Sequence, residues 1–78
     1  MTNVEQYFHI MDKYRKGIYG DKSLHLNEIL EKAGEPDLLD RMTSVELAAI
    51  RAKSSGAFRG ALNKMIDERK NGKRSGKN

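Results

Sequence analysis

Short runs of apolar residues at helical spacing constrain the fold of this chain more than any other feature. The first run extends from Val4 to Ile18 and forms one stripe, so an amphipathic helix is predicted over residues 3–16. Thr2 and Glu5 have the spacing of a capping box, in which each side chain accepts a hydrogen bond from the backbone N–H of the other residue. This box marks the start of the predicted helix.

Glycines divide the following sequence into further short helices. Gly17 and Gly20 are expected to end the first helix, because glycine adopts the left-handed backbone that closes helices. A second helix is predicted to begin at a cap formed by Asp21 or Ser23 and to stop at Gly34. Each of these signals lies within a few residues of a helix end, so the expected ends of the helices follow from the sequence alone.

Further short helices are predicted after Gly34. Pro36 suits the first turn of a third short helix, which carries a few apolar residues. Thr43 and Glu46 form a second capping box, and a final apolar face extends from Ala57 to Ile66. No alternating apolar pattern indicates a strand. The predicted fold is all-α, a small bundle of four or five helices.

The composition limits what such a bundle can do. The chain has 78 residues and no cysteine, so we expect one helical domain over residues 1–68, no disulfide and a thin core. Neither His9 nor His25 has neighbours typical of metal ligands, and no nucleophile motif occurs. No enzymatic activity, catalytic residue, metal or cofactor is therefore expected. No apolar run reaches the roughly 18 residues of a membrane span, so a cytoplasmic location is expected.

Charge is distributed unevenly along the sequence. Residues 1–52 contain seven bases and nine acids, whereas residues 53–78 contain eight bases and two acids, which gives net charges of −2 and +6. A basic end on an acidic body favours a polyanionic partner. Residues 69–78 are predicted to form a basic flexible tail that stays disordered until it binds. The alternative is a solvated tail without a specific partner.

Residues 43–65 suggest how a nucleic acid is bound. The pattern is a capped helix, a break near Ala52, a second cap at Ser54 or Ser55, and another helix. The second helix then exposes Arg59, which can donate twice to guanine, and Asn63, which can pair with adenine. The predicted DNA-binding residues are Lys53, Ser54, Ser55, Arg59, Asn63, Lys64, Arg69, Lys70, Lys73, Arg74 and Lys77.

This segment resembles the helix-turn-helix of bacterial transcription regulators, particularly the GntR-like winged-helix group. The resemblance is carried by Glu46-Leu47-Ala48, Ser54, Arg59 and Ala61-Leu62. It implies a small, dimeric DNA-binding regulator that favours duplex DNA, although the basic tail also leaves RNA open. Arg51 and Lys53 depart from the family pattern, because such positions usually carry buried apolar side chains. The β-wing of the family has no counterpart after the last predicted helix.

A continuous helix from Ser44 to about Glu68 is the alternative to a break. Its interior glycines would cost stability unless another backbone packs against them. On this interpretation Ala52, Gly56 and Gly60 form a helix-packing seam, either within the domain or between the two copies of a homodimer.

A different resemblance supports a second function. The opening Val4-Glu5-Gln6-Tyr7-Phe8 through Lys13-Tyr14-Arg15-Lys16 looks like the start of Hha-type expression modulators. That family implies a small helical protein that binds a nucleoid protein. By analogy with small basic proteins of phages and plasmids, the alternative function is a protein-binding modulator of a host transcription, replication or nucleoid protein. The sequence is compatible with both functions.

Overall fold

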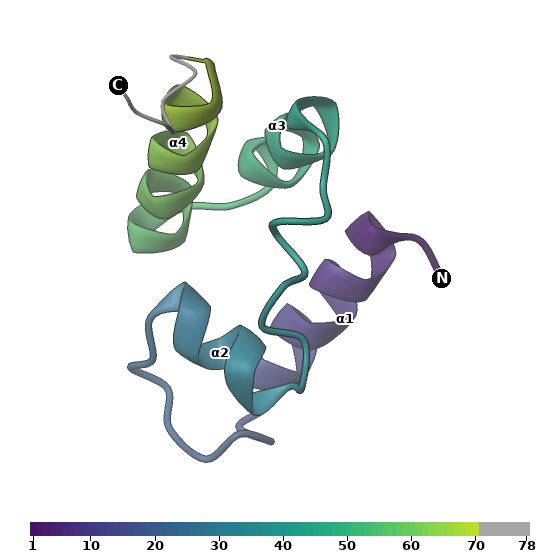
Figure 1. Ribbon diagram of the computed structural model, residues 1–78. Coiled ribbons are helices and arrows are strands. Elements are labelled where there is room, and N and C mark those ends of the chain that lie inside the picture. The colour runs from purple at the N-terminus through teal and green to yellow at the C-terminus, as the bar shows by residue number, and fades with distance from the viewer. Residues whose placement is uncertain (71–78) are drawn as a thin grey trace. The chain divides into compact units, whose positions relative to one another are not determined.

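The computed structural model describes residues 1–70, and the described chain is all-α, as the sequence predicts. It contains four helices and no strand within these residues. Figure 1 shows the helices, which are α1 (Asn3–Arg15), α2 (Leu26–Lys32), α3 (Ser44–Ala52) and α4 (Gly56–Lys70).

The helices belong to two compact units, Met1–Met42 and Thr43–Asn78. The first contains α1 and α2, which contact each other, and the second contains α3 and α4, which also contact each other. The boundary lies inside the single helical domain expected over residues 1–68. In addition, α4 continues to Lys70, so Arg69 and Lys70 belong to a helix although they were expected in the tail.

The start of α1 confirms the predicted capping box. The Thr2 hydroxyl accepts a 3.1 Å hydrogen bond from the Glu5 N–H, and the Glu5 carboxylate accepts one of 2.8 Å from the Thr2 N–H. The bond from the Thr2 backbone is the main cause that lowers the pKa of Glu5, because it favours the ionised carboxylate. After the helix, Gly17 has a φ of 80°, as expected for a residue that closes a helix.

The buried face of α1 differs partly from the predicted stripe. Tyr7, Met11 and Tyr14, which belong to the predicted stripe between Val4 and Ile18, are buried, and Ile10 joins them. The Tyr14 hydroxyl donates a hydrogen bond to the backbone carbonyl of Lys22, which fixes the loop before α2. Ile18, in contrast, is 61% exposed. The helical period no longer applies to Ile18 because α1 has already ended at Arg15.

The predicted cap of α2 is wrong. This helix begins at Leu26 with His25 at its N-cap, and the Glu28 carboxylate accepts a 2.8 Å hydrogen bond from the His25 N–H. The Asp21 carboxylate instead accepts bonds from the N–H and the hydroxyl of Ser23, both of 2.8 Å. These two residues therefore form a local turn within the loop, which is a common alternative role for such side chains.

The segment after Pro36 is a series of turns and not the expected third helix. Leu38, Leu39 and Met42 are buried nevertheless. Arg41 bonds to the Glu35 carboxylate at 2.9 Å and so ties the two ends of this segment together. The apolar spacing was therefore a correct indication of burial but not of a regular helix.

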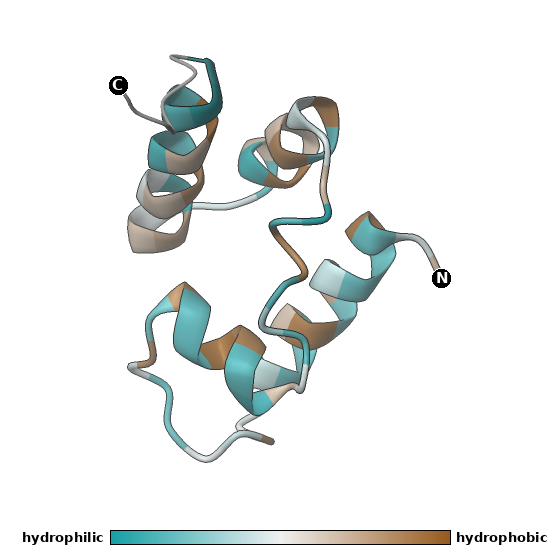
Figure 2. Cartoon of the chain, viewed as in Figure 1, coloured by the Kyte–Doolittle hydropathy of each residue, from teal (hydrophilic) through white to brown (hydrophobic). Residues whose placement is uncertain are grey.

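The second unit begins with a capping box that the sequence predicts correctly. The Thr43 hydroxyl accepts from the Glu46 N–H at 3.1 Å, and the Glu46 carboxylate accepts from the Thr43 N–H at 2.8 Å. Figure 2 shows apolar stretches on both helices of this unit, separated by hydrophilic ones. The buried apolar residues of α3 and α4 are Leu47, Ile50, Leu62 and Ile66.

Candidate nucleic-acid interface

A break separates α3 from α4 at the predicted position. Only Lys53, Ser54 and Ser55 lie between the end of α3 and the start of α4, and the two helices contact each other. In Figure 1, α4 runs upward in the plane of the view and α3 runs at an angle to it. A short turn between crossing helices is the arrangement of a helix-turn-helix. The alternative of one continuous helix from Ser44 to Glu68 is therefore wrong.

The break is formed by side chains whose roles differ from those expected. The half-buried Ser54 donates a 2.7 Å hydrogen bond from its hydroxyl to the Ile50 carbonyl. The same carbonyl also accepts a 3.2 Å hydrogen bond from the Lys53 N–H. The Ser54 hydroxyl therefore helps to close α3 and does not cap α4. Gly56 then begins α4 with a φ of 61°, a conformation that L residues rarely adopt.

Arg59 is exposed near the start of α4, as predicted. Its guanidinium makes no hydrogen bond or ion pair to a residue that the structure describes. Asn63 and Lys70 are also exposed, and their spacing from Arg59 places all three on one side of a helix with 3.6 residues per turn. We call Arg59, Asn63 and Lys70 the basic face of α4.

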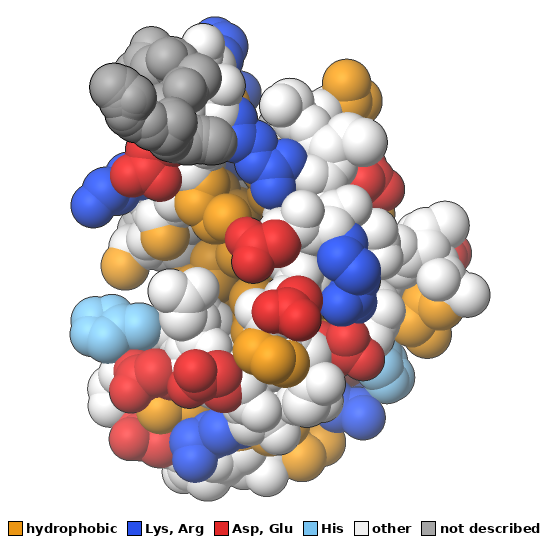
Figure 3. Space-filling model, in the orientation of Figure 1, with side chains coloured by type: hydrophobic (Ala, Val, Ile, Leu, Met, Phe, Trp, Pro, Cys, Tyr) orange, Lys and Arg blue, Asp and Glu red, His pale blue; other side chains and the backbone are white. Residues whose placement is uncertain are grey.

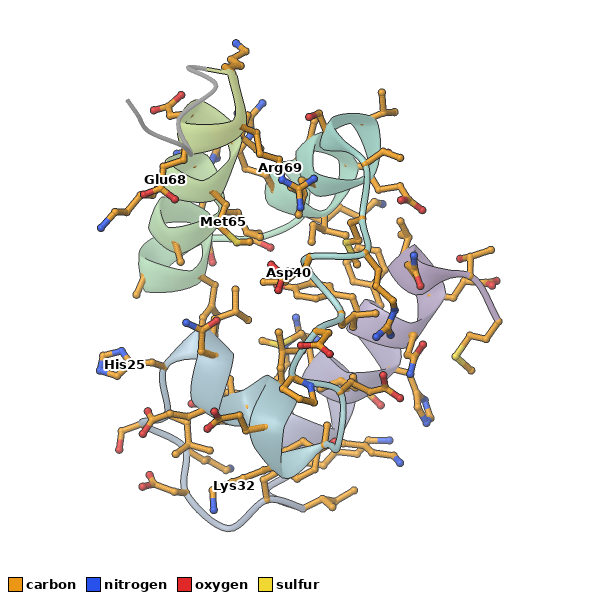
Figure 4. All side chains as sticks on the ribbon, in the orientation of Figure 1. His25, Lys32, Asp40, Met65, Glu68 and Arg69 are labelled. Carbon is orange, nitrogen blue, oxygen red and sulfur yellow. The ribbon has the colours of Figure 1, made fainter. Side chains whose placement is uncertain are left out.

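Two other predicted residues of α4 lie away from the basic face. Lys64 is exposed, but its position along the helix directs it to another side. Arg69 is half-buried, and Figure 4 shows its side chain directed from α4 toward α3, whereas Glu68 points away from α3. The helix therefore brings together three of its five predicted DNA-binding residues.

The remaining predicted residues lie outside α4. Lys53 and Ser55 are exposed in the turn before α4, where they lie close in sequence to Arg59. Lys73, Arg74 and Lys77 lie outside the residues that the structure describes.

Arg51 is a member of this site that the sequence interpretation did not assign. Its Nη1 atom donates a 3.2 Å hydrogen bond to Oδ1 of Asn63, which links α3 to the basic face of α4. The only sequence signal was that a base stands where helix-turn-helix motifs usually carry an apolar residue. That signal indicated a departure from the motif but not the partner of Arg51.

Within the described residues, no other backbone packs against the predicted seam. Ala52, Gly56 and Gly60 are all exposed, and a Cβ added to either glycine would meet nothing within 4 Å. A seam within the domain is therefore wrong, whereas a seam between two copies of the chain stays a prediction. Instead, Gly56 provides the backbone conformation at the start of α4, and Gly60 leaves open space beside Arg59.

The division of charge nearly follows the division into units. The sequence of the first unit, residues 1–42, contains six bases and eight acids, and that of the second contains nine bases and three acids. The net charges are therefore −2 and +6. Figure 3 shows Lys and Arg side chains beside the end of α4 and acidic side chains gathered over α2. The first turn of α4 also contains no acid, unlike those of the other three helices.

Comparison with known proteins does not assign this site. No protein family, curated protein or solved structure matches the chain. Among the described helices, none is both long enough and apolar enough to cross a membrane. The described His, Asp and Glu side chains form no group of three or more that is arranged to hold a metal ion.

Proposed function

We propose that this chain is a small DNA-binding regulator of transcription that inserts α4 into the major groove. The observation that carries the proposal is the exposure of Arg59 on the helix that follows a three-residue turn. In helix-turn-helix proteins the residues near the start of the second helix contact the bases. Arg59 occupies this position, and its guanidinium can donate to two acceptors of guanine.

The charge of the second unit supports the same proposal. Duplex DNA carries a dense row of phosphates, and Lys and Arg supply most of the affinity that does not depend on sequence. The second unit has a net charge of +6 in its sequence. Lys53 in the turn and Lys70 on the basic face are exposed, so both are available to phosphates on either side of the base contacts.

Duplex binding by the full chain tests this function. Fluorescence anisotropy with a short labelled duplex is expected to show affinity that falls linearly with the logarithm of salt concentration. Arg59→Gln should weaken binding, whereas Lys32→Gln at the end of α2 is the matched loss of one charge in the first unit and should change it little. Absence of binding at low salt, or binding that salt does not weaken, would contradict the proposal.

A competition experiment separates DNA from RNA. An unlabelled RNA duplex of the same sequence has a deep, narrow major groove that side chains do not read. We therefore expect it to displace the labelled DNA only weakly. Displacement at equal or lower concentration than the unlabelled DNA duplex would assign the site to RNA.

A second candidate function is a protein-binding modulator, and one exposed surface favours it. Val45 is 79% exposed, and Ala49 and Ala52 are exposed on the same side of α3. For a modulator that docks through this side, Val45→Asp should abolish nuclease-resistant capture of a protein partner and leave duplex affinity nearly unchanged. Capture that survives the substitution would count against this surface.

A further inference from the structure

The hydrogen bond between Arg51 and Asn63 determines how Asn63 presents its side-chain amide. Arg51 is half-buried on α3, Asn63 is exposed on α4, and the bond joins Nη1 of the first to Oδ1 of the second over 3.2 Å. An arginine side chain has donors only, so the amide atom that faces it is necessarily the oxygen. The amide nitrogen of Asn63 is then left for an outside ligand.

This arrangement changes what Asn63 can recognise. Pairing with adenine requires the amide oxygen to accept from the base while the amide nitrogen donates to it. Here the oxygen already accepts from a cation, and an adenine amino group would have to approach beside the Arg51 guanidinium. Donation from the amide nitrogen remains unhindered. The expected role of Asn63 as an adenine reader therefore gives way to that of a donor.

The neighbouring residue on the basic face also offers donors only. Arg59 precedes Asn63 by four residues, which corresponds to about 6 Å along a helix. Successive base pairs are about 3.4 Å apart, so the two side chains can reach bases about two steps apart. In the major groove guanine presents two acceptors, N7 and O6, whereas adenine presents one acceptor and one donor.

We propose that Arg51 makes the basic face of α4 a donor-only surface that selects guanine in duplex DNA. This inference rests on the proposed function and names the base that the same site prefers. A surface that carries only donors binds a pair of hydrogen-bond acceptors. Guanine N7 and O6 supply such a pair, and so do phosphate oxygens, so the experiment has to distinguish the two sources.

The experiment measures affinity ratios of the full chain by fluorescence anisotropy. Three labelled duplexes of equal length are compared, one made of A·T pairs, one with two G·C pairs placed two steps apart, and one in which 7-deazaguanine replaces those guanines. The guanine duplex is expected to bind at least about fivefold more tightly than the A·T duplex. The 7-deaza duplex should lose most of this preference, because it lacks N7 but keeps every phosphate.

Two variants test the roles of Arg51 and Asn63. Arg51→Met removes the donor and should reduce the guanine preference, whereas Lys53→Met removes a nearby charge and should lower both affinities without changing their ratio. Asn63→Asp can still accept from Arg51 but has no donor, so it should reduce the preference while keeping α3 and α4 linked. Helical content by circular dichroism verifies that each variant is folded.

The outcomes separate this inference from the proposed function. Absence of duplex binding at low salt overturns both. Binding with equal affinity for the guanine and 7-deaza duplexes assigns the contacts to phosphate and overturns the inference alone. A preference for adenine in the unsubstituted chain, or a guanine preference that survives both Arg51→Met and Asn63→Asp, also overturns the inference alone.

Discussion

The hydroxyl of Ser54 donates a 2.7 Å hydrogen bond to the backbone carbonyl of Ile50, four residues earlier. This bond lies at the point where α3 gives way to the turn before α4. Ile50 is fully buried, so the bond fixes a carbonyl next to the apolar core of the second unit. The position of the break is thus set by a side chain of the turn as well as by the helices around it.

Loss of this bond should destabilise the second unit. Ser54→Ala removes the hydroxyl donor and leaves the Ile50 carbonyl with the 3.2 Å bond from the Lys53 N–H, at an expected cost of about 1 kcal/mol in the free energy of unfolding. Urea unfolding followed by circular dichroism measures the cost. Ser55→Ala, at an exposed neighbouring position, is the control for the loss of a turn hydroxyl. An equal cost for both variants would contradict the role assigned to Ser54.

Two glycines of α4 should respond to alanine in opposite directions. Gly56 has a φ of 61°, so Gly56→Ala forces an L residue into the left-handed region and should destabilise the protein by about 1–2 kcal/mol. Gly60 lies within α4 with open space around it, so Gly60→Ala should stabilise by about 0.5–1 kcal/mol. Thermal unfolding of the two variants side by side measures both effects. Destabilisation or a change in oligomeric state by Gly60→Ala would show that another backbone packs there.

Removal of an acid from α4 should strengthen DNA binding. Asp67 is exposed and follows Asn63 by one turn, which places a negative charge at the border of the basic face. Asp67→Asn removes its repulsion of phosphates and is expected to tighten duplex binding about threefold at low salt. The control is Glu68→Gln, because Glu68 lies farther from the basic face around the helix. A larger gain from the control would place the DNA on the other side of α4.

The ion pair of the first unit should make its stability depend on pH. The hydrogen bond from Arg41 is the main cause that lowers the pKa of Glu35 below its ordinary value of 4.5. A carboxyl group with a lowered pKa contributes stability that is fully present above pH 4.5 and is lost as the pH falls through the folded-state value. NMR titration of the Glu35 carboxyl carbon should show this lowered pKa.

The Arg41→Gln variant identifies the cause of the lowered pKa. In this variant the Glu35 pKa should rise toward its ordinary value, because the charged donor is missing. Lys64→Gln removes one charge from the other unit and should leave the Glu35 titration unchanged. A Glu35 pKa that stays low in Arg41→Gln would assign the effect to another donor, such as Gln6, whose hydrogen bond contributes less.

The features that the sequence predicts best are those that depend on residues within one helical turn. The pairs Thr2–Glu5 and Thr43–Glu46 form the predicted capping boxes because each box is complete in four residues. The cap of α2 could not be chosen by the same rule, since Asp21 and Ser23 bond to each other within the loop. Short polar side chains fit both roles, and only the course of the chain decides between them.

In the candidate site, too, the sequence does not predict contacts between residues that lie far apart in the chain. The sequence predicted the break before α4 and the exposure of Arg59, because both follow from local pattern and helical period. It did not predict that Arg51 bonds to Asn63, twelve residues later. That contact depends on how α3 and α4 cross, which no single-helix pattern specifies. The role of a side chain within a site can therefore be assigned only when the packing of the helices is known.

The capping box at Thr43 has a consequence for the start of the second unit. Both the N–H and the hydroxyl of Thr43 bond to Glu46, so the first residue of the second unit is anchored entirely by residues on its own side of the boundary. A twist of the backbone at Met42 would leave these two bonds intact. The start of α3 therefore keeps its cap whatever conformation the backbone adopts at Met42.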